Sequence, residues 1–132
     1  MKQVVVSMLL LFLPMMAGAA EFEIGGIYYT IGFGKYAIVT KTPEKYGYKG
    51  EIVIPEMIEY EGVNYEVKEI GDGAFFGCTN LISVVIPNTV NVIRKNAFAR
   101  CTGLTIIDLP KSIKSIPHGA FDYCSKLKNV VI

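Results

Sequence analysis

The chain contains Ile70-Gly-Asp-Gly-Ala-Phe-Phe-Gly-Cys-Thr-Asn-Leu81, and the pattern returns as Ile93-Arg-Lys-Asn-Ala-Phe-Ala-Arg-Cys-Thr-Gly-Leu104 and Ile116-Pro-His-Gly-Ala-Phe-Asp-Tyr-Cys-Ser-Lys-Leu127. The interval between successive copies is constant, and the Ala, Phe, Cys and Leu keep their places in all three. A strict period of about 23 residues is typical of a solenoid, in which each repeat forms one coil that stacks on its neighbour. The sequence therefore predicts stacked coils from residue 70 onward.

Each repeat contains two segments. The first segment contains the apolar residues Leu81, Val84 and Ile86, and the two-residue spacing of the last two predicts a strand. Pro87 ends this strand, because proline has no amide hydrogen with which to continue the ladder. In the second, Ala, Phe and Cys stand at the fourth, fifth and eighth positions after an Ile, which predicts one short helical turn facing inward. We therefore expect an α/β repeat with coils of about 23 residues.

Stacking explains how so short a coil becomes stable, because one coil cannot bury its apolar face alone. Equivalent side chains, such as Phe75, Phe98 and Phe121, are expected to lie in register and form dry columns. Phe98 and Leu104 belong to the middle coil. We expect these two positions to be the most sensitive to truncation.

Residues 21–69 lack the repeat and show strand patterns instead. The runs 27–31 and 36–40, separated by Gly32-Phe-Gly-Lys35, predict a hairpin. The runs 51–55 and 63–67 predict two further strands, with Glu61-Gly62 in the turn between them. A stack of coils ends in an apolar layer and an open strand edge, so residues 21–69 are expected to form an N-terminal β-hairpin cap.

A partial first repeat is predicted inside this cap. Ile52-Val-Ile-Pro55 resembles the end of a repeat strand, but the next repeat Ile follows nine residues later than it does after Pro87, which indicates an insertion around residues 59–65. The expected organisation is a signal peptide at 1–20, the cap at 21–69 and repeats at 70–132. The repeats divide into 70–92, 93–115 and an incomplete 116–132.

The first twenty residues have the pattern of a secretory signal peptide. Lys2 precedes a run over residues 4–16 that is apolar except for Ser7 and Pro14, and Ala17-Gly-Ala-Ala20 suits cleavage after residue 19 or 20. A membrane anchor is the weaker alternative, because a spanning helix needs about 20 apolar residues. We expect a secreted or cell-surface protein, with no membrane insertion after cleavage.

The charge balance excludes a nucleic-acid or anionic-membrane partner. The chain has 13 basic and 12 acidic residues, and loss of Lys2 with the signal peptide leaves 12 of each. A neutral chain has no electrostatic footprint for nucleic acid or for an anionic membrane. About 112 residues remain, which is the size of one domain.

The three cysteines, Cys78, Cys101 and Cys124, occupy the same place in successive repeats and form no close pair. Zinc sites need close pairs of ligands, so no metal site is predicted. Export would permit disulfides, yet three is an odd number, and we expect buried free thiols. His118 is the only histidine and stands at a variable position, so we predict no catalytic residue and no cofactor.

The repeated motif resembles the BspA-like leucine-rich repeat, directly over residues 70–132 and weakly at 52–55. The resemblance implies a right-handed solenoid with a parallel sheet on one face. It also implies a secreted or cell-surface protein of the kind common in Bacteroidetes-like bacteria, associated with adhesion to host matrix proteins or other cells. The family has no defined catalytic residues, so a non-enzymatic protein is expected.

The outward positions of the predicted sheet form the default binding surface of such a repeat. They are Ser83, Val85, Ile106, Asp108, Asn129 and Val131. The expected partner is a protein or glycan on host or neighbouring cells. The cap also contains seven tyrosines, which either pack the hairpins or form a second binding surface; they are Tyr28, Tyr29, Tyr36, Tyr46, Tyr48, Tyr60 and Tyr65.

The chain departs from the family pattern in having few repeats and in stopping at Ile132, where Pro is expected next. Three interpretations stay open. The chain is an exported binding module, or it is a truncated N-terminal fragment of a larger surface repeat protein with no ligand of its own. The third is end-to-end association of two chains through the open C-terminal coil.

Overall fold

A computed structural model describes residues 20–131, without the side chains of Asn129 and Val131. The predicted signal peptide, apart from Ala20, and Ile132 lie outside the described residues.

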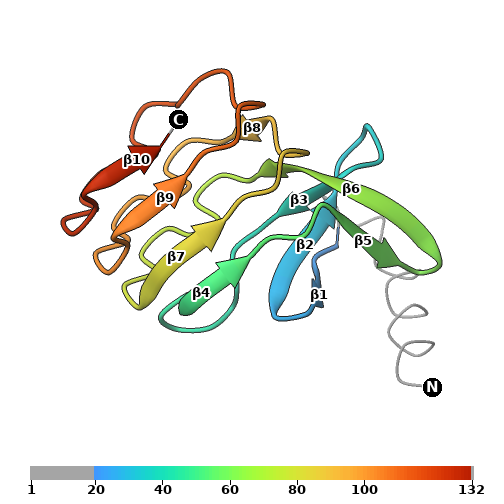
Figure 1. Ribbon diagram of the computed structural model, residues 1–132. Helices are drawn as coiled ribbons and strands as arrows, with labels where there is room; N and C mark the ends of the chain where they lie inside the picture. The colour runs from blue at the N-terminus through green and yellow to red at the C-terminus, as the bar shows by residue number, and fades with distance from the viewer. Residues whose placement is uncertain (1–19, 132) are drawn as a thin grey trace.

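One face of the molecule is a parallel sheet of four strands, with one strand from each successive coil (Figure 1). The strands are β4 (Gly50–Val53), β7 (Leu81–Val85), β9 (Ile106–Asp108) and β10 (Asn129–Val131), in the order β10-β9-β7-β4. Ser83 pairs with Ile106, which pairs with Asn129, so each partner lies one full repeat further along the chain. The sequence period therefore sets the register of this sheet.

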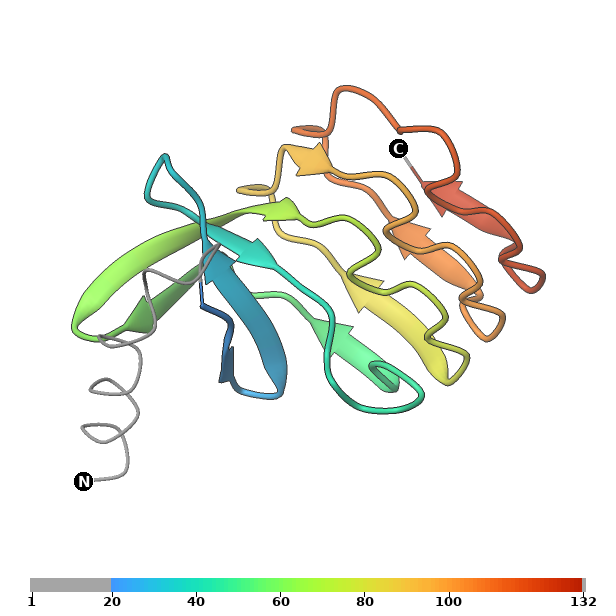
Figure 2. The same cartoon turned by 180° about the vertical axis from the view of Figure 1, so that it is seen from behind.

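The second sheet contains β1 (Phe22–Ile24), β2 (Ile27–Ile31), β3 (Ala37–Val39), β5 (Met57–Tyr60), β6 (Val63–Ile70) and β8 (Val92–Ile93). The predicted hairpin is confirmed, since β2 and β3 pair antiparallel. Strand β3 then pairs parallel with β6, and β6 with β8, which places the hairpin alongside the coils (Figure 2).

The prediction for residues 51–67 was partly wrong. The Glu61-Gly62 turn joins β5 to β6, whereas the strand predicted at 51–55 is β4 and belongs to the other sheet. The insertion around residues 59–65 is the tip of the β5–β6 hairpin, where Tyr60 pairs with Val63. Strands β1 and β5 were not predicted.

The predicted helical turn was also wrong, because residues 20–131 contain strands and turns but no helix. The backbone N–H groups of residues 73–78 alternate between two kinds of acceptor. Those of Ala74, Phe76 and Cys78 donate to the carbonyl three residues earlier, whereas those of Phe75 and Gly77 donate to the next coil. A helix needs successive N–H groups to bond within the segment, and here every second one stabilises the stack instead.

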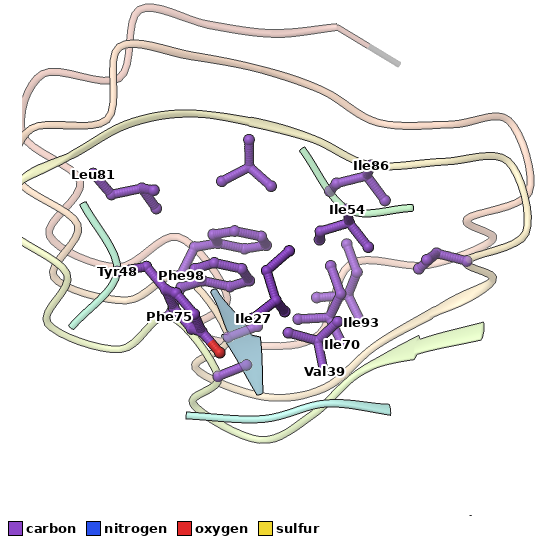
Figure 3. Packing of buried hydrophobic residues seen from close by; sticks show 14 of the residues in the cluster. Ile27, Val39, Tyr48, Ile54, Ile70, Phe75, Leu81, Ile86, Ile93 and Phe98 are labelled. Carbon is purple, nitrogen blue, oxygen red and sulfur yellow. The ribbon is translucent and has the colours of Figure 1, made fainter. Parts of the chain in front are cut away.

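The core consists of columns shared between coils (Figure 3). The rings of Phe75 and Phe98 stack with centroids 4.9 Å apart, and those of Phe98 and Phe121 with centroids 5.4 Å apart, as predicted. Tyr48 extends this column into the N-terminal part, 4.8 Å from Phe75. Leu81 and Leu104 are fully buried in a parallel column.

Two positions in each coil adopt a left-handed backbone. The first is occupied by Gly73, Asn96 and Gly119, and the second by Gly77, Arg100 and Tyr123. Only glycine adopts this conformation freely, and other L-residues are disfavoured there by roughly 1–2 kcal/mol. Arg100 (φ 62°) and Tyr123 (φ 59°) therefore occupy strained positions.

Candidate functional site

The register of the four-stranded sheet aligns alternate positions of its strands in two rows. One row contains Glu51, Ser83, Ile106 and Asn129, and the other contains Val53, Val85, Asp108 and Val131. The structure thus brings all six predicted positions onto the strands of one sheet, although the side chains of Asn129 and Val131 are not described. These two rows and Ile82 are called the sheet face below.

Sequence reasoning missed Glu51 and Val53, which β4 adds to the two rows. The sequence did indicate this strand, because residues 52–55 resemble the end of a repeat strand. The indication was weak because the strand lacks the repeat leucine, whose place is taken by Gly50, the partner of Leu81. The register also shifts between Gly50 and Glu51, which leaves Ile82 exposed.

The described part of the sheet face has at least one exposed aliphatic side chain on each of β4, β7 and β9, with an acidic residue on β4 and another on β9. Val53 is 64% exposed, Val85 55%, Ile82 52% and Ile106 44%. Glu51 and Asp108 are exposed, and neither row contains an aromatic residue. Isolated apolar side chains are normal on a protein surface, but neighbouring ones on a flat sheet are typical of a contact site.

The three thiols are free, with Cys78 and Cys101 buried and Cys124 half-buried. The Cys101 thiol donates a hydrogen bond to the Phe75 carbonyl (2.9 Å), and Cys124 does the same to Phe98 (3.0 Å). Hydrogen bonding with the neighbouring thiols, together with burial, raises the pKa of Cys101. Cys101 is therefore a poor nucleophile, whereas the hydrogen bond with Cys101 lowers the pKa of Cys78 and lowers that of Cys124 to about 7.

Most of the seven tyrosines pack the N-terminal part. Tyr29 and Tyr48 are buried, and only Tyr46 is exposed. Tyr60 stacks on Phe22 with ring centroids 3.6 Å apart. These contacts favour packing over a second binding surface for most of the set.

A buried carboxylate also links three neighbouring strands of the six-stranded sheet, β3, β6 and β8. Glu69 is 6% exposed and accepts hydrogen bonds from Arg94 Nε (2.7 Å) and the Tyr36 hydroxyl (3.1 Å). The negative charge of Glu69 raises the pKa of Tyr36 and, through its hydrogen bond, that of Arg94. His118 is exposed, and residues 20–131 hold no group of three His, Cys, Asp or Glu side chains that could bind a metal ion.

The repeat model described as "BspA type Leucine rich repeat region (6 copies)" matches residues 56–132. The chain belongs to the BspA-type leucine-rich repeat family. This confirms the family resemblance that the motif indicated. A comparison with curated proteins found no match to this BspA-type chain.

Solved structures agree with the BspA-type fold. A leucine-rich repeat protein from Bacteroides ovatus ATCC 8483 is 30% identical with a TM-score of 0.74, over 84% of this chain and 29% of that one. The leucine-rich repeat protein of T. pallidum is 30% identical with a TM-score of 0.70, and the match covers 86% of this chain and 50% of that one. A leucine-rich repeat protein from Bacteroides capillosus ATCC 29799 is 23% identical with a TM-score of 0.63, over 84% of this chain and 96% of that one, and shows the fold alone.

The BspA-type chain thus spans less than a third of the first relative and half of the second. Among residues 20–131 there is no helix of the length and hydrophobicity that crossing a membrane requires.

Proposed function

We propose that this chain is an exported, non-enzymatic BspA-type module that binds a protein or glycan through the sheet face. The observation that carries the proposal is the set of exposed aliphatic side chains of Val53, Val85 and Ile106, which stand on three adjacent strands of a hydrogen-bonded parallel sheet. A rigid surface loses little conformational freedom on binding, which favours affinity. Export and a role in adhesion are supported by the signal-peptide pattern and by the family.

The test is capture from extracts of host matrix or of cell surfaces by the immobilised protein. The variant V85K/I106K places two charges at the centre of the sheet face and should abolish specific capture. Val63→Lys is a matched control, because Val63 is also exposed (50%) but lies on the β5–β6 hairpin. Capture that survives V85K/I106K would overturn the sheet face as the site.

A second candidate is that the chain is the N-terminal part of a larger surface repeat protein and has no ligand of its own. The chain covers only 29% and 50% of the lengths of the two relatives at 30% identity, which favours this interpretation. The genomic reading frame past Ile132 tests it. If further repeats follow and only the longer protein captures a partner, the independent module is excluded.

A further inference from the structure

A second surface lies away from the sheet face, where the turn segments of successive coils meet. Residues 73–78, 96–101 and 119–124 are joined by backbone hydrogen bonds such as Gly77 to Ala99 and Arg100 to Asp122. The loop before β4 continues this row, because a Cβ atom on Gly47 would overlap Cys78 Sγ. Figure 2 shows these segments side by side behind the four-stranded sheet.

Three pairs of an exposed aromatic ring and a cation stand on these segments. Arg100 Cζ lies 4.7 Å from the ring centroid of Tyr123, which is 70% exposed. The other two pairs place Lys45 Nζ 5.0 Å from Tyr46 and Lys41 Nζ 5.8 Å from Phe76. We call these six residues the turn face. Contact with a ring holds each cation at a defined place above the surface.

The backbone gives an independent indication that the turn face has a use. Arg100 and Tyr123 hold left-handed φ angles of 62° and 59° at the position that Gly77 occupies in the preceding coil. Glycine adopts this conformation without steric conflict. Both side chains are exposed and add little to the core. Large exposed side chains at strained backbone positions are typical of functional surfaces.

We propose that the turn face binds an acidic glycan, a polysaccharide that carries carboxylate or sulfate groups. The exposed rings provide apolar surface for the C–H faces of sugar rings, and the hydroxyl groups of Tyr46 and Tyr123 add polar contacts. The Arg100 guanidinium matches the planar or forked oxygens of a carboxylate or sulfate. The pairs of Lys41 and Tyr46 lie beside the first coil, and the pair of Arg100 and Tyr123 joins the next two coils, so a linear chain that runs along the stack would meet all three pairs.

The observations favour a glycan over single-stranded nucleic acid, which also combines stacking with negative charge. A nucleic acid carries one charge per phosphate and needs a strongly basic groove. The turn face has exposed acids beside its cations, Glu44 next to Lys45 and Asp122 next to Tyr123. Sparse cations between acidic groups suit a polymer with about one charge per disaccharide, in which the charges are further apart than in a nucleic acid.

The experiment measures binding of the purified protein to hyaluronan, keratan sulfate, neutral dextran and oligo(dT). Binding to hyaluronan or keratan sulfate that weakens with salt is expected, and which of the two binds distinguishes carboxylate from sulfate recognition. Affinity for that glycan should fall at least tenfold in R100G/Y123G. This variant should keep or raise the melting temperature, because glycine relieves the left-handed strain.

Matched variants separate this site from general charge effects. Val63→Lys, on the β5–β6 hairpin, and Lys114→Ala should leave glycan affinity unchanged, since both positions lie outside the turn face and the sheet face. Failure to bind either acidic glycan, equal binding to dextran, tighter binding to oligo(dT), or full affinity in a folded R100G/Y123G protein would each overturn the proposal. None of these results bears on capture through the sheet face.

Discussion

The ring of Tyr48 lies 4.8 Å from that of Phe75, at the place where the aromatic column of the coils meets the N-terminal hairpin. Its hydroxyl group accepts a hydrogen bond from the Tyr28 N–H (2.9 Å) and donates one to the Thr40 carbonyl (2.6 Å). One side chain therefore packs on the first coil and satisfies backbone groups on both sides of the β2–β3 hairpin.

Replacing Tyr48 with Phe should lower the free energy of unfolding by about 1–3 kcal/mol, because it leaves these buried backbone groups without their partner. Urea denaturation measures the change. Tyr29→Phe is the matched control, since the Tyr29 hydroxyl is buried without a hydrogen-bond partner in the described part of the chain. That substitution should be neutral or slightly stabilising, and equal losses in the two variants would contradict the prediction.

Phe98→Ala should lower the free energy of unfolding by about 3–5 kcal/mol, because Phe98 is fully buried between two stacked rings. Phe121→Ala should cost clearly less, since Phe121 is only partly buried at the same position of the next coil. Thermal and urea unfolding of both variants check the order. A larger effect at Phe121 would show that the stack is not stabilised from its middle coil.

Gly47→Ala should destabilise the protein by about 1–3 kcal/mol or more, because the new methyl group overlaps Cys78 Sγ and the backbone is left-handed (φ 74°). Adding Cys78→Ala should restore part of the loss by removing the overlap. Gly25→Ala is the control for backbone strain alone, since its φ is 61° and the space around it is open. If Gly25→Ala costs as much as Gly47→Ala, contact with Cys78 is unimportant.

Stability should fall at alkaline pH. Burial raises the pKa of Tyr29 from 10.0 to about 12 and also raises that of Tyr48. The folded protein therefore holds these protons more tightly than the unfolded chain, and the stabilisation is complete below pH 10 and lost as pH rises toward 12. Urea midpoints between pH 8 and 12 should show this decrease, and Tyr29→Phe should reduce its slope above pH 10. A slope unchanged by that substitution would exclude Tyr29 as a source.

The constant repeat period was enough to predict the Phe75–Phe98–Phe121 column and the sheet register, because identical spacing places equivalent side chains in equivalent environments. Spacing could not distinguish a helical turn from the observed turn, since the deciding hydrogen bonds run from Phe75 and Gly77 to another coil. Such bonds depend on tertiary contacts that a local pattern does not contain.

For the candidate site, the sequence placed six positions on one sheet but missed Glu51 and Val53, whose strand lacks the repeat leucine. Of the turn face it singled out Tyr46 alone, as one of the seven cap tyrosines. The aromatic–cation pairs join residues from different segments, as in Lys41 with Phe76 and Arg100 with Tyr123, and the strain at Arg100 is a property of the backbone.

The alternating hydrogen bonds of the turn segments have an evolutionary consequence. On one side of the stack they connect residues such as Phe75 and Ala97, whose separation in the sequence is one residue less than a full repeat. On the other side, the sheet connects residues such as Ser83 and Ile106, which are separated by a full repeat. Duplication or loss of a whole coil preserves both offsets, whereas insertion of a single residue into a coil disrupts one of them. Genes for such proteins are therefore free to lengthen by entire units, but their individual units tolerate small insertions and deletions poorly.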